Sequence, residues 1–365
     1  MRELALLFTR LGLIGFGGPA AHIALMRDEV VRRRGWLSDG EFLDLVGAVN
    51  LLPGPNSTEL AIHIGRRRAG VPGLLVAGLC FILPATLLVL ACAWAYVRYG
   101  RVPAVAGAWQ GAKPVVVAIV LWALAGFMKI AVRSRLAAGA GVLALGLTAA
   151  GVHELVVLLV SGLLVLTVRQ GPRGAGAGVA ALAPWWAPGA LLPATAGLGG
   201  LFLFFLKVGS VLYGSGYVLL AFLRSGLVER SGLLTEAQLL DAVAVGQVTP
   251  GPVFTAATFV GYLLHGVPGA LAATAGIFLP AFLLAGLSGV LLPRLRRSPA
   301  ARAFLDGVNV GSLALMAVVT WQLGRGALTS VPAWLLAVGS LALLGAGVNS
   351  AWLIAAGAFA GFLLR

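Results

Sequence analysis

Apolar segments of about 20 residues recur along nearly the whole chain, separated by short polar or basic stretches. A segment of this length is what an α-helix needs to cross the hydrocarbon core of a bilayer. The segments lack the period-2 alternation that is typical of membrane β-strands. The pattern predicts an all-α polytopic membrane protein, with first-half apolar segments at about residues 4–24, 73–97, 104–128, 136–150 and 154–168.

Two apolar stretches are interrupted by the same helix-breaking sequence, Pro53-Gly54-Pro55 within residues 47–65 and Pro250-Gly251-Pro252 within residues 242–261. Proline inside a helix removes a backbone donor and clashes with the preceding turn. The helical legs on both sides are too short to cross a core about 30 Å thick. Each stretch is therefore predicted to form a re-entrant hairpin or one broken helix, and the two Pro-Gly-Pro turns are expected to meet near the membrane midplane.

The two interrupted stretches belong to an internal repeat. Residues 35–55 align with residues 232–252 without a gap, and further upstream Arg10 aligns with Lys207. We predict two transporter repeats, residues 1–168 and 198–365, joined by a Gly/Pro/Ala-rich linker over residues 169–197. The first leg of each hairpin begins with a capping-box sequence, Ser38 with Glu41 in the first hairpin and Thr235 with Gln238 in the second.

Basic residues indicate the topology. The chain has 26 Lys and Arg against 12 Asp and Glu, a formal net charge of +14. On a soluble protein this excess would indicate nucleic acid, but basic loops of membrane proteins stay in the cytoplasm, so no nucleic-acid partner is expected. Arg66-Arg67-Arg68 follows the first hairpin, whereas Tyr262-Leu263-Leu264 follows the second. This difference favours an inverted repeat of two five-span halves with both termini outside. Counting each hairpin as two spans would instead make the halves parallel.

The interrupted helices supply donors that suit an anion. Inverted-repeat transporters place the ends of broken helices at a midplane site, and a helix N-terminus carries partial positive charge and free N–H groups. Hydroxyl, amide and cationic side chains nearby suit a tetrahedral oxyanion, and glycine breaks allow close backbone approach. The candidate substrate-binding residues are Pro53, Gly54, Pro55, Asn56, Ser57, Thr58, Thr249, Pro250, Gly251, Pro252, Thr255, Thr258, Lys207, Arg10, Gly17, Gly18, Gly214 and Gly216.

Three carboxylates near the hairpins are candidates for coupling. Asp44 and Asp241 occupy equivalent positions on the first legs, where each could pair with a cation or carry a proton. Glu59 follows the first Pro-Gly-Pro turn and has Ala256 as its counterpart. A carboxylate beside an anion must be paired or protonated. We therefore predict Glu59 as the proton carrier if transport is coupled to protons.

The sequence offers no arrangement for a metal site or covalent catalysis. Cys80 and Cys92 fall in one predicted span without a Cys-x-x-Cys motif, and the four His residues show no ligand spacing. A membrane enzyme acting on a phosphorylated lipid would need a nucleophile or a metal-binding cluster. We expect neither enzymatic activity nor a cofactor.

Residues 15–70, with their Gly-Phe-Gly-Gly-Pro and Pro-Gly-Pro-Asn sequences, and residues 246–266, with Thr-Pro-Gly-Pro, resemble the chromate ion transporter family in its long, two-domain form. The resemblance extends over nearly the whole chain. It implies a multi-pass protein of a prokaryotic inner (plasma) membrane that exports chromate and confers chromate resistance.

These observations lead us to expect a secondary transporter that exports chromate, a divalent tetrahedral oxyanion, by alternating access between the halves. A transporter or exchanger of sulfate or a related oxyanion is the first alternative, because sulfate shares the shape and charge of chromate and would compete with it. An anion channel is the second alternative. The lipid bilayer is the expected environment, and the sequence leaves a homodimer open.

Overall fold

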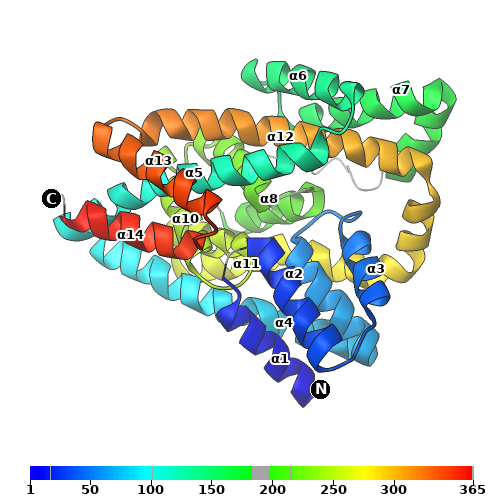
Figure 1. Cartoon of the computed structure of the whole chain (residues 1–365), viewed down its shortest axis with the longest axis horizontal. Helices are drawn as coiled ribbons and strands as arrows, with labels where there is room; N and C mark the ends of the chain where they lie inside the picture. The colour runs from blue at the N-terminus through cyan, green and yellow to red at the C-terminus, as the bar shows by residue number, and fades with distance from the viewer. Residues whose placement is uncertain (17, 101, 183–196, 214–215, 364–365) are drawn as a thin grey trace.

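The computed structural model describes residues 1–16, 18–100, 102–182, 197–213 and 216–363. Its secondary structure is helical, with no strand among these residues, so the predicted all-α fold is confirmed (Figure 1). The α-helices are α1 (Arg2–Ile14), α2 (Gly18–Arg27), α3 (Asp39–Val49), α4 (Asn56–Tyr99), α5 (Pro103–Ala131), α6 (Arg135–Ala149), α7 (Glu154–Leu182), α8 (Leu198–Val211), α9 (Leu219–Leu223), α10 (Glu236–Val248), α11 (Ala256–Arg297), α12 (Pro299–Ala327), α13 (Val331–Gly345) and α14 (Ser350–Leu363).

Several of these helices are long and apolar enough to cross a membrane. In the described part of the chain, five such segments are Asn56–Tyr99, Val105–Ala131, Glu154–Gly171, Val253–Ser288 and Pro299–Ala327. Helices α6, α8, α13 and α14 are shorter but also apolar. Large apolar side chains on these helices face outward, as a lipid-embedded protein requires. The chain is therefore a multi-pass membrane protein.

The helices are interrupted at the first Pro-Gly-Pro turn, as predicted, and also within the apolar segment at residues 4–24. Helix α1 ends at Ile14 and α2 begins at Gly18, while α3 ends at Val49 and α4 begins at Asn56. Both predicted capping boxes are confirmed. The amide of Ser38 donates to Glu41 Oε2 over 2.9 Å and the amide of Glu41 donates to Ser38 Oγ over 3.3 Å. Thr235 and Gln238 exchange the corresponding bonds over 2.9 and 3.2 Å.

Helices α4 and α11 each fold back on themselves through a sharp turn. The turn in α4 lies at Ala69 and Gly70, where Gly70 has φ 62°, and the turn in α11 has Gly266 at φ 60°. A Cβ on Gly73 would overlap the carbonyl oxygen of Gly65, which lies eight positions earlier. In a straight helix those residues would be about 12 Å apart. Each element is therefore a short leg followed by one long helix.

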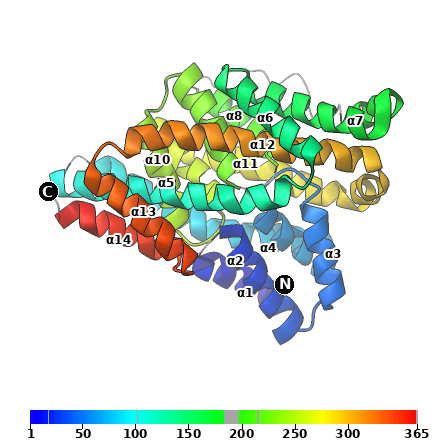
Figure 2. The same cartoon turned by 45° about the horizontal axis from the view of Figure 1, so that its top comes forward.

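The two halves of the chain are interleaved (Figures 1 and 2). Helices α6 and α7 of the first half pack along α12 of the second, whereas α13 and α14 pack along α5. A Cβ on Gly111 would overlap the carbonyl oxygen of Gly357, and one on Gly307 would overlap that of Ser161. Gly111 and Gly307 are equivalent in the two halves. Small residues permit such close helix crossings in membranes, so each half holds the final helices of the other.

Part of the predicted linker is helical. Helix α7 continues to Leu182 through a break at Gly171, which has φ 72°. Residues 183–196 and the candidate glycines Gly17 and Gly214 lie outside the described residues.

Candidate functional site

Each Pro-Gly-Pro turn is buried against the other half of the chain. We call Pro53-Gly54-Pro55 the first tip and Pro250-Gly251-Pro252 the second tip; both are buried. The amide of Gly54 donates a 2.8 Å hydrogen bond to the carbonyl of Leu212, where α8 ends. The amide of Gly251 donates an equal bond to the carbonyl of Gly15, where α1 ends. Each tip therefore donates a hydrogen bond to the residue at which a helix of the opposite half ends.

These two bonds join equivalent positions. Gly251 lies 197 residues after Gly54, and Leu212 lies 197 residues after Gly15 (251 − 54 and 212 − 15). Contacts that are exchanged in this way are what two halves related by a two-fold axis make. Gly54 and Gly251 have φ values of 131° and 94°. Only glycine tolerates these values without strain, which explains why both tips keep a central glycine.

His22 joins the second tip and was missed in the sequence. Its Nε2 lies 2.8 Å from the carbonyl oxygen of Gly15, the same oxygen that accepts from Gly251. Because a carbonyl only accepts, Nε2 carries the hydrogen. The His22 side chain is buried and the equivalent residue in the second half is Leu219. The signal in the sequence was a lone histidine, which carries no spacing information.

Glu59 lies directly against the first tip. Its side chain is 0% exposed, and neither carboxyl oxygen has a hydrogen-bond partner among the described residues. A Cβ on Gly54 would lie 2.7 Å from Glu59 Oε1, so the carboxyl group fills the concave side of the turn. Burying an ionised, unpaired carboxylate is far more costly than burying a neutral one. The first tip therefore packs against a buried carboxyl group that forms no hydrogen bond with any described residue.

The hydroxyl groups around the two tips differ in availability. In the second half, Thr249 Oγ1 donates to Val245, and Thr255 Oγ1 donates to Pro252, each over 2.8 Å. Thr258 Oγ1 lies 2.7 Å from Thr274 Oγ1. In the first half, the buried Thr58 hydroxyl has no partner in the described part of the chain. A free hydroxyl donor therefore lies after the first tip, at Thr58 in the first turn of α4.

The side chains of the two aligned cations, Arg10 and Lys207, contact Glu29 and Phe204. Arg10 is more than half exposed and pairs with Glu29 over 3.6 Å. The ammonium group of Lys207 lies over the ring of Phe204, 5.4 Å from its centroid. Gly18 begins α2, and Gly216 begins a short 3₁₀ turn that faces Phe254.

Asp241 is paired, as one of its two predicted roles requires. Lys113 Nζ lies 3.6 Å from Asp241 Oδ1, and the Tyr96 hydroxyl donates to Asp241 Oδ2 over 2.9 Å. Helix α5 of the first half is thus joined to α10 of the second. Asp44, the equivalent residue in the first half, lies on α3.

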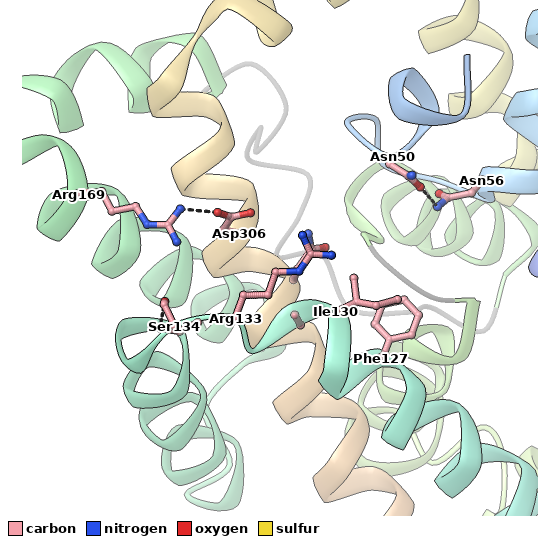
Figure 3. A pocket seen from close by; sticks show the side chains of 11 residues that line it. Asn50, Asn56, Phe127, Ile130, Arg133, Ser134, Arg169 and Asp306 are labelled. Carbon is pink, nitrogen blue, oxygen red and sulfur yellow. Dashed lines mark hydrogen bonds and ion pairs between the residues drawn. The ribbon is translucent and has the colours of Figure 1, made fainter. Parts of the chain in front are cut away.

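A cavity of about 390 Å³ opens beside the first tip (Figure 3). Asn50 and Asn56, which flank the tip, face each other on one side, where Asn56 Nδ2 donates to Asn50 Oδ1 over 2.8 Å. Arg169 pairs with Asp306 on the other side, and Arg133 lies between the two pairs in this view. We call this space the Arg133 cavity. Its polar lining is Asn50, Asn56, Arg133, Ser134, Arg169, Asp306 and Asn309.

No cluster of three or more His, Cys, Asp or Glu side chains with metal-binding geometry occurs in the described residues. The chemistry of the tips is that of backbone amides, hydroxyls and one buried carboxyl group, which can bind an anion and move a proton.

Comparison with known proteins places the chain in a family. The family described as Chromate transporter matches residues 2–166 and 199–362. The chromate transport protein of Cupriavidus metallidurans is 32% identical over 362 residues, covering 94% of this chain and 88% of that protein. The chromate transport protein of Pseudomonas aeruginosa is 34% identical over 342 residues, with coverage of 89% and 81%. A probable chromate transport protein of Synechococcus elongatus is 32% identical over 357 residues, with coverage of 94% and 89%.

No solved structure matches the chain. The family match covers most of the chain, and the relatives align over more than four fifths of their own length. The chain belongs to the chromate transporter family.

Proposed function

We propose that the chain is a secondary transporter that exports chromate across the prokaryotic plasma membrane and thereby confers chromate resistance. Relatives with 32–34% identity are named chromate transport proteins, which supports the substrate. The single observation that carries the proposal is the reciprocal pair of hydrogen bonds from the tips, Gly54 to Leu212 and Gly251 to Gly15. These bonds hold each Pro-Gly-Pro tip against the end of a helix in the opposite half. The tips therefore lie at the interface of the halves, where transporter sites lie.

The substrate site in this proposal lies at the first turn of α4. Ser57 and Thr58 are buried there, and the hydroxyl of Thr58 is free to donate. The free amides of a helix N-terminus add partial positive charge. A divalent tetrahedral oxyanion offers four acceptor oxygens to such donors. The second tip contributes its backbone, because its threonine hydroxyls already have partners.

The exchanged packing of the halves supports alternating access as the mechanism in this proposal. If the two-fold axis lies in the membrane plane, the first tip enters from one face and the second from the other, as in an inverted repeat of five-span halves. Rocking of one half against the other would then expose the site to each face in turn. The basic loop Arg66-Arg67-Arg68 after the first hairpin supports a cytoplasmic position for that face and an outside position for both termini.

Membrane potential is sufficient to drive this export. Moving one elementary charge through 100 mV is worth about 2.3 kcal/mol, so a dianion leaving a negative interior gains about 4.6 kcal/mol. Glu59 is the group through which a proton would be exchanged, because it is buried, unpaired and beside the first tip.

Chromate uptake into inside-out membrane vesicles tests the site. Ser57→Ala and Thr58→Val should reduce the initial rate several-fold at equal membrane abundance, because each removes a donor from the first turn of α4. Ser340→Ala is the matched control, since Ser340 is also buried but lies in α13. Rates that stay at the wild-type level in both tip variants would remove the substrate from this position.

A further inference from the structure

The Arg133 cavity holds a cation that no acidic group compensates. Arg169 forms an ion pair with Asp306. The Arg133 side chain makes neither a hydrogen bond nor an ion pair with any described residue, although it stands at the end of α5 beside that pair. The lining therefore carries two arginines and one aspartate, a net charge of +1 (2 − 1). An anion entering the cavity meets a guanidinium group that is free to bind it.

Amide donors connect this cation with the first tip. The bond from Asn56 Nδ2 to Asn50 Oδ1 fixes both side chains in place. It leaves the amide group of Asn50 and one hydrogen of Asn56 unused. Asn309 also lines the cavity and has no hydrogen bond to a described side chain. Asn56 is the first residue of α4, so the cavity borders on the turn that carries Ser57 and Thr58.

The positions equivalent to the Arg133 cavity carry different side chains in the other half. Arg133 corresponds to Thr329, and Asn309 corresponds to Lys113, whose charge is paired with Asp241. A separate cavity of about 270 Å³ lies beside Thr249, but none of these equivalent residues lines it and its lining is apolar over most of its surface. The unpaired cation of the Arg133 cavity is therefore a feature of one half of the chain.

We propose that the Arg133 cavity is a separate, low-affinity binding site for a divalent tetrahedral oxyanion, which collects the anion before it reaches the first tip. This inference rests on the proposed function, because it assumes that the tip receives the same anion. Arg133 supplies the attraction, and Asn50 and Asn56 receive the ion from it. Asp306 limits the affinity by neutralising Arg169, which lets the ion move on.

The test is the concentration dependence of chromate flux in vesicles that expose the Arg133 face. Arg133→Gln should raise the KM for chromate about five-fold, the effect of one exposed charge, and leave the maximal rate unchanged. Arg133→Lys should restore most of the affinity. Arg135→Gln is the matched control. It removes the same charge only two residues further along the chain, and the Arg135 side chain does not line the cavity.

Two further readouts separate an electrostatic site from a structural effect. Asp306→Asn raises the net charge of the cavity and should lower the KM. Both KM changes should shrink at high salt, because the Debye length falls from about 10 Å at 0.1 M to about 3 Å at 1 M. A vesicle preparation of the opposite orientation should show no effect of either substitution on the KM.

The outcomes distinguish this inference from the proposed function. If Arg133→Gln and Arg135→Gln give the same KM while wild-type flux is saturable, the cavity site is wrong and the transporter assignment stands. Where Arg133→Gln does not reach the membrane, Asp306→Asn decides: an unchanged KM overturns the site. If wild-type vesicles move neither chromate nor sulfate, the proposed function itself fails.

Discussion

The amide of Gly251 donates a 2.8 Å hydrogen bond to the carbonyl oxygen of Gly15, which belongs to the other half of the chain. The same bond exists between Gly54 and Leu212 at the equivalent positions. Each interrupted helix is therefore anchored at the break of a helix in the opposite half. The halves cannot move past each other without rearranging these two contacts, which is why we place the transport site there.

The close crossing of α5 and α14 gives a prediction about stability. Gly111→Ala should lower the melting temperature in detergent, because the new Cβ would overlap the carbonyl oxygen of Gly357, and overpacking costs about 1–3 kcal/mol. Gly126→Ala is the control on the same helix, where no atom lies within 4 Å of a new Cβ. It should be neutral or stabilise by up to about 1 kcal/mol. Equal melting temperatures for both variants would refute the exchanged packing.

Glu59 gives a prediction about coupling. Glu59→Gln should leave folding unchanged, because neither carboxyl oxygen has a partner to lose among the described residues. It should abolish the response of chromate flux to a pH gradient while the response to membrane potential remains. The control is Glu3→Gln, an exposed residue paired with Arg34 over 2.5 Å. A variant that still responds to the pH gradient would exclude Glu59 as the proton carrier.

The Lys113–Asp241 pair gives a prediction about coupling between α5 and α10. Asp241→Asn should destabilise the protein by up to about 3 kcal/mol, because it leaves a largely buried ammonium group without its counter-charge. Combining it with Lys113→Gln should recover much of that loss. Unfolding of the single and double variants in detergent measures the interaction as a double-mutant cycle.

The exposed pair of Arg27 with Asp39, 2.6 Å apart, is the reference for that cycle. Its removal should cost less than about 1 kcal/mol. If the buried pair shows no larger interaction energy than the exposed one, it does not hold the two helices together.

The capping boxes give a prediction about pH. The pKa of the Glu41 carboxyl is lowered from its usual value, first by the hydrogen bond from the Ser38 amide, then by the Ser38 hydroxyl and by Arg67. A lowered pKa in the folded state means that stabilisation is complete above the unfolded pKa and is lost as pH falls through the folded pKa. Hydrogen exchange in the first turn of α3 should therefore accelerate, relative to its intrinsic rate, in acid.

Helix α10 is the internal control for that experiment. Its box has Gln238 in place of a glutamate, so its first turn should show no such change. Identical pH profiles for the first turns of α3 and α10 would contradict the account of the caps.

Local features of this fold were predictable from the sequence. The helix breaks at the two Pro-Gly-Pro turns follow from proline chemistry, and both capping boxes follow from residue types three positions apart. The sharp turn at Gly70 was not predicted, because the basic run before it and the apolar run after it are compatible with an ordinary loop. Its counterpart at Gly266 shows the same geometry without the basic run.

Long-range features of the site were not predictable. The bond from Gly54 to Leu212 joins backbone atoms that carry no sequence signal, and the aligned cations Arg10 and Lys207 contact different kinds of partner, Glu29 and Phe204. Lys113, rather than either of these, pairs with Asp241. In the sequence Arg133 is one basic loop residue among many, and only the tertiary structure places it in one cavity with Asn50 and Asn56 beside the first tip.

The central claim is that the chain moves chromate as a saturable transporter driven by membrane potential. Chromate flux into liposomes that contain the purified protein, with potential and pH clamped separately, tests it most directly. We predict a flux that saturates with chromate concentration, rises with a potential that attracts the anion, and is inhibited by sulfate. A flux that is absent, or a current that grows in proportion to voltage without saturating as in a channel, would contradict the account.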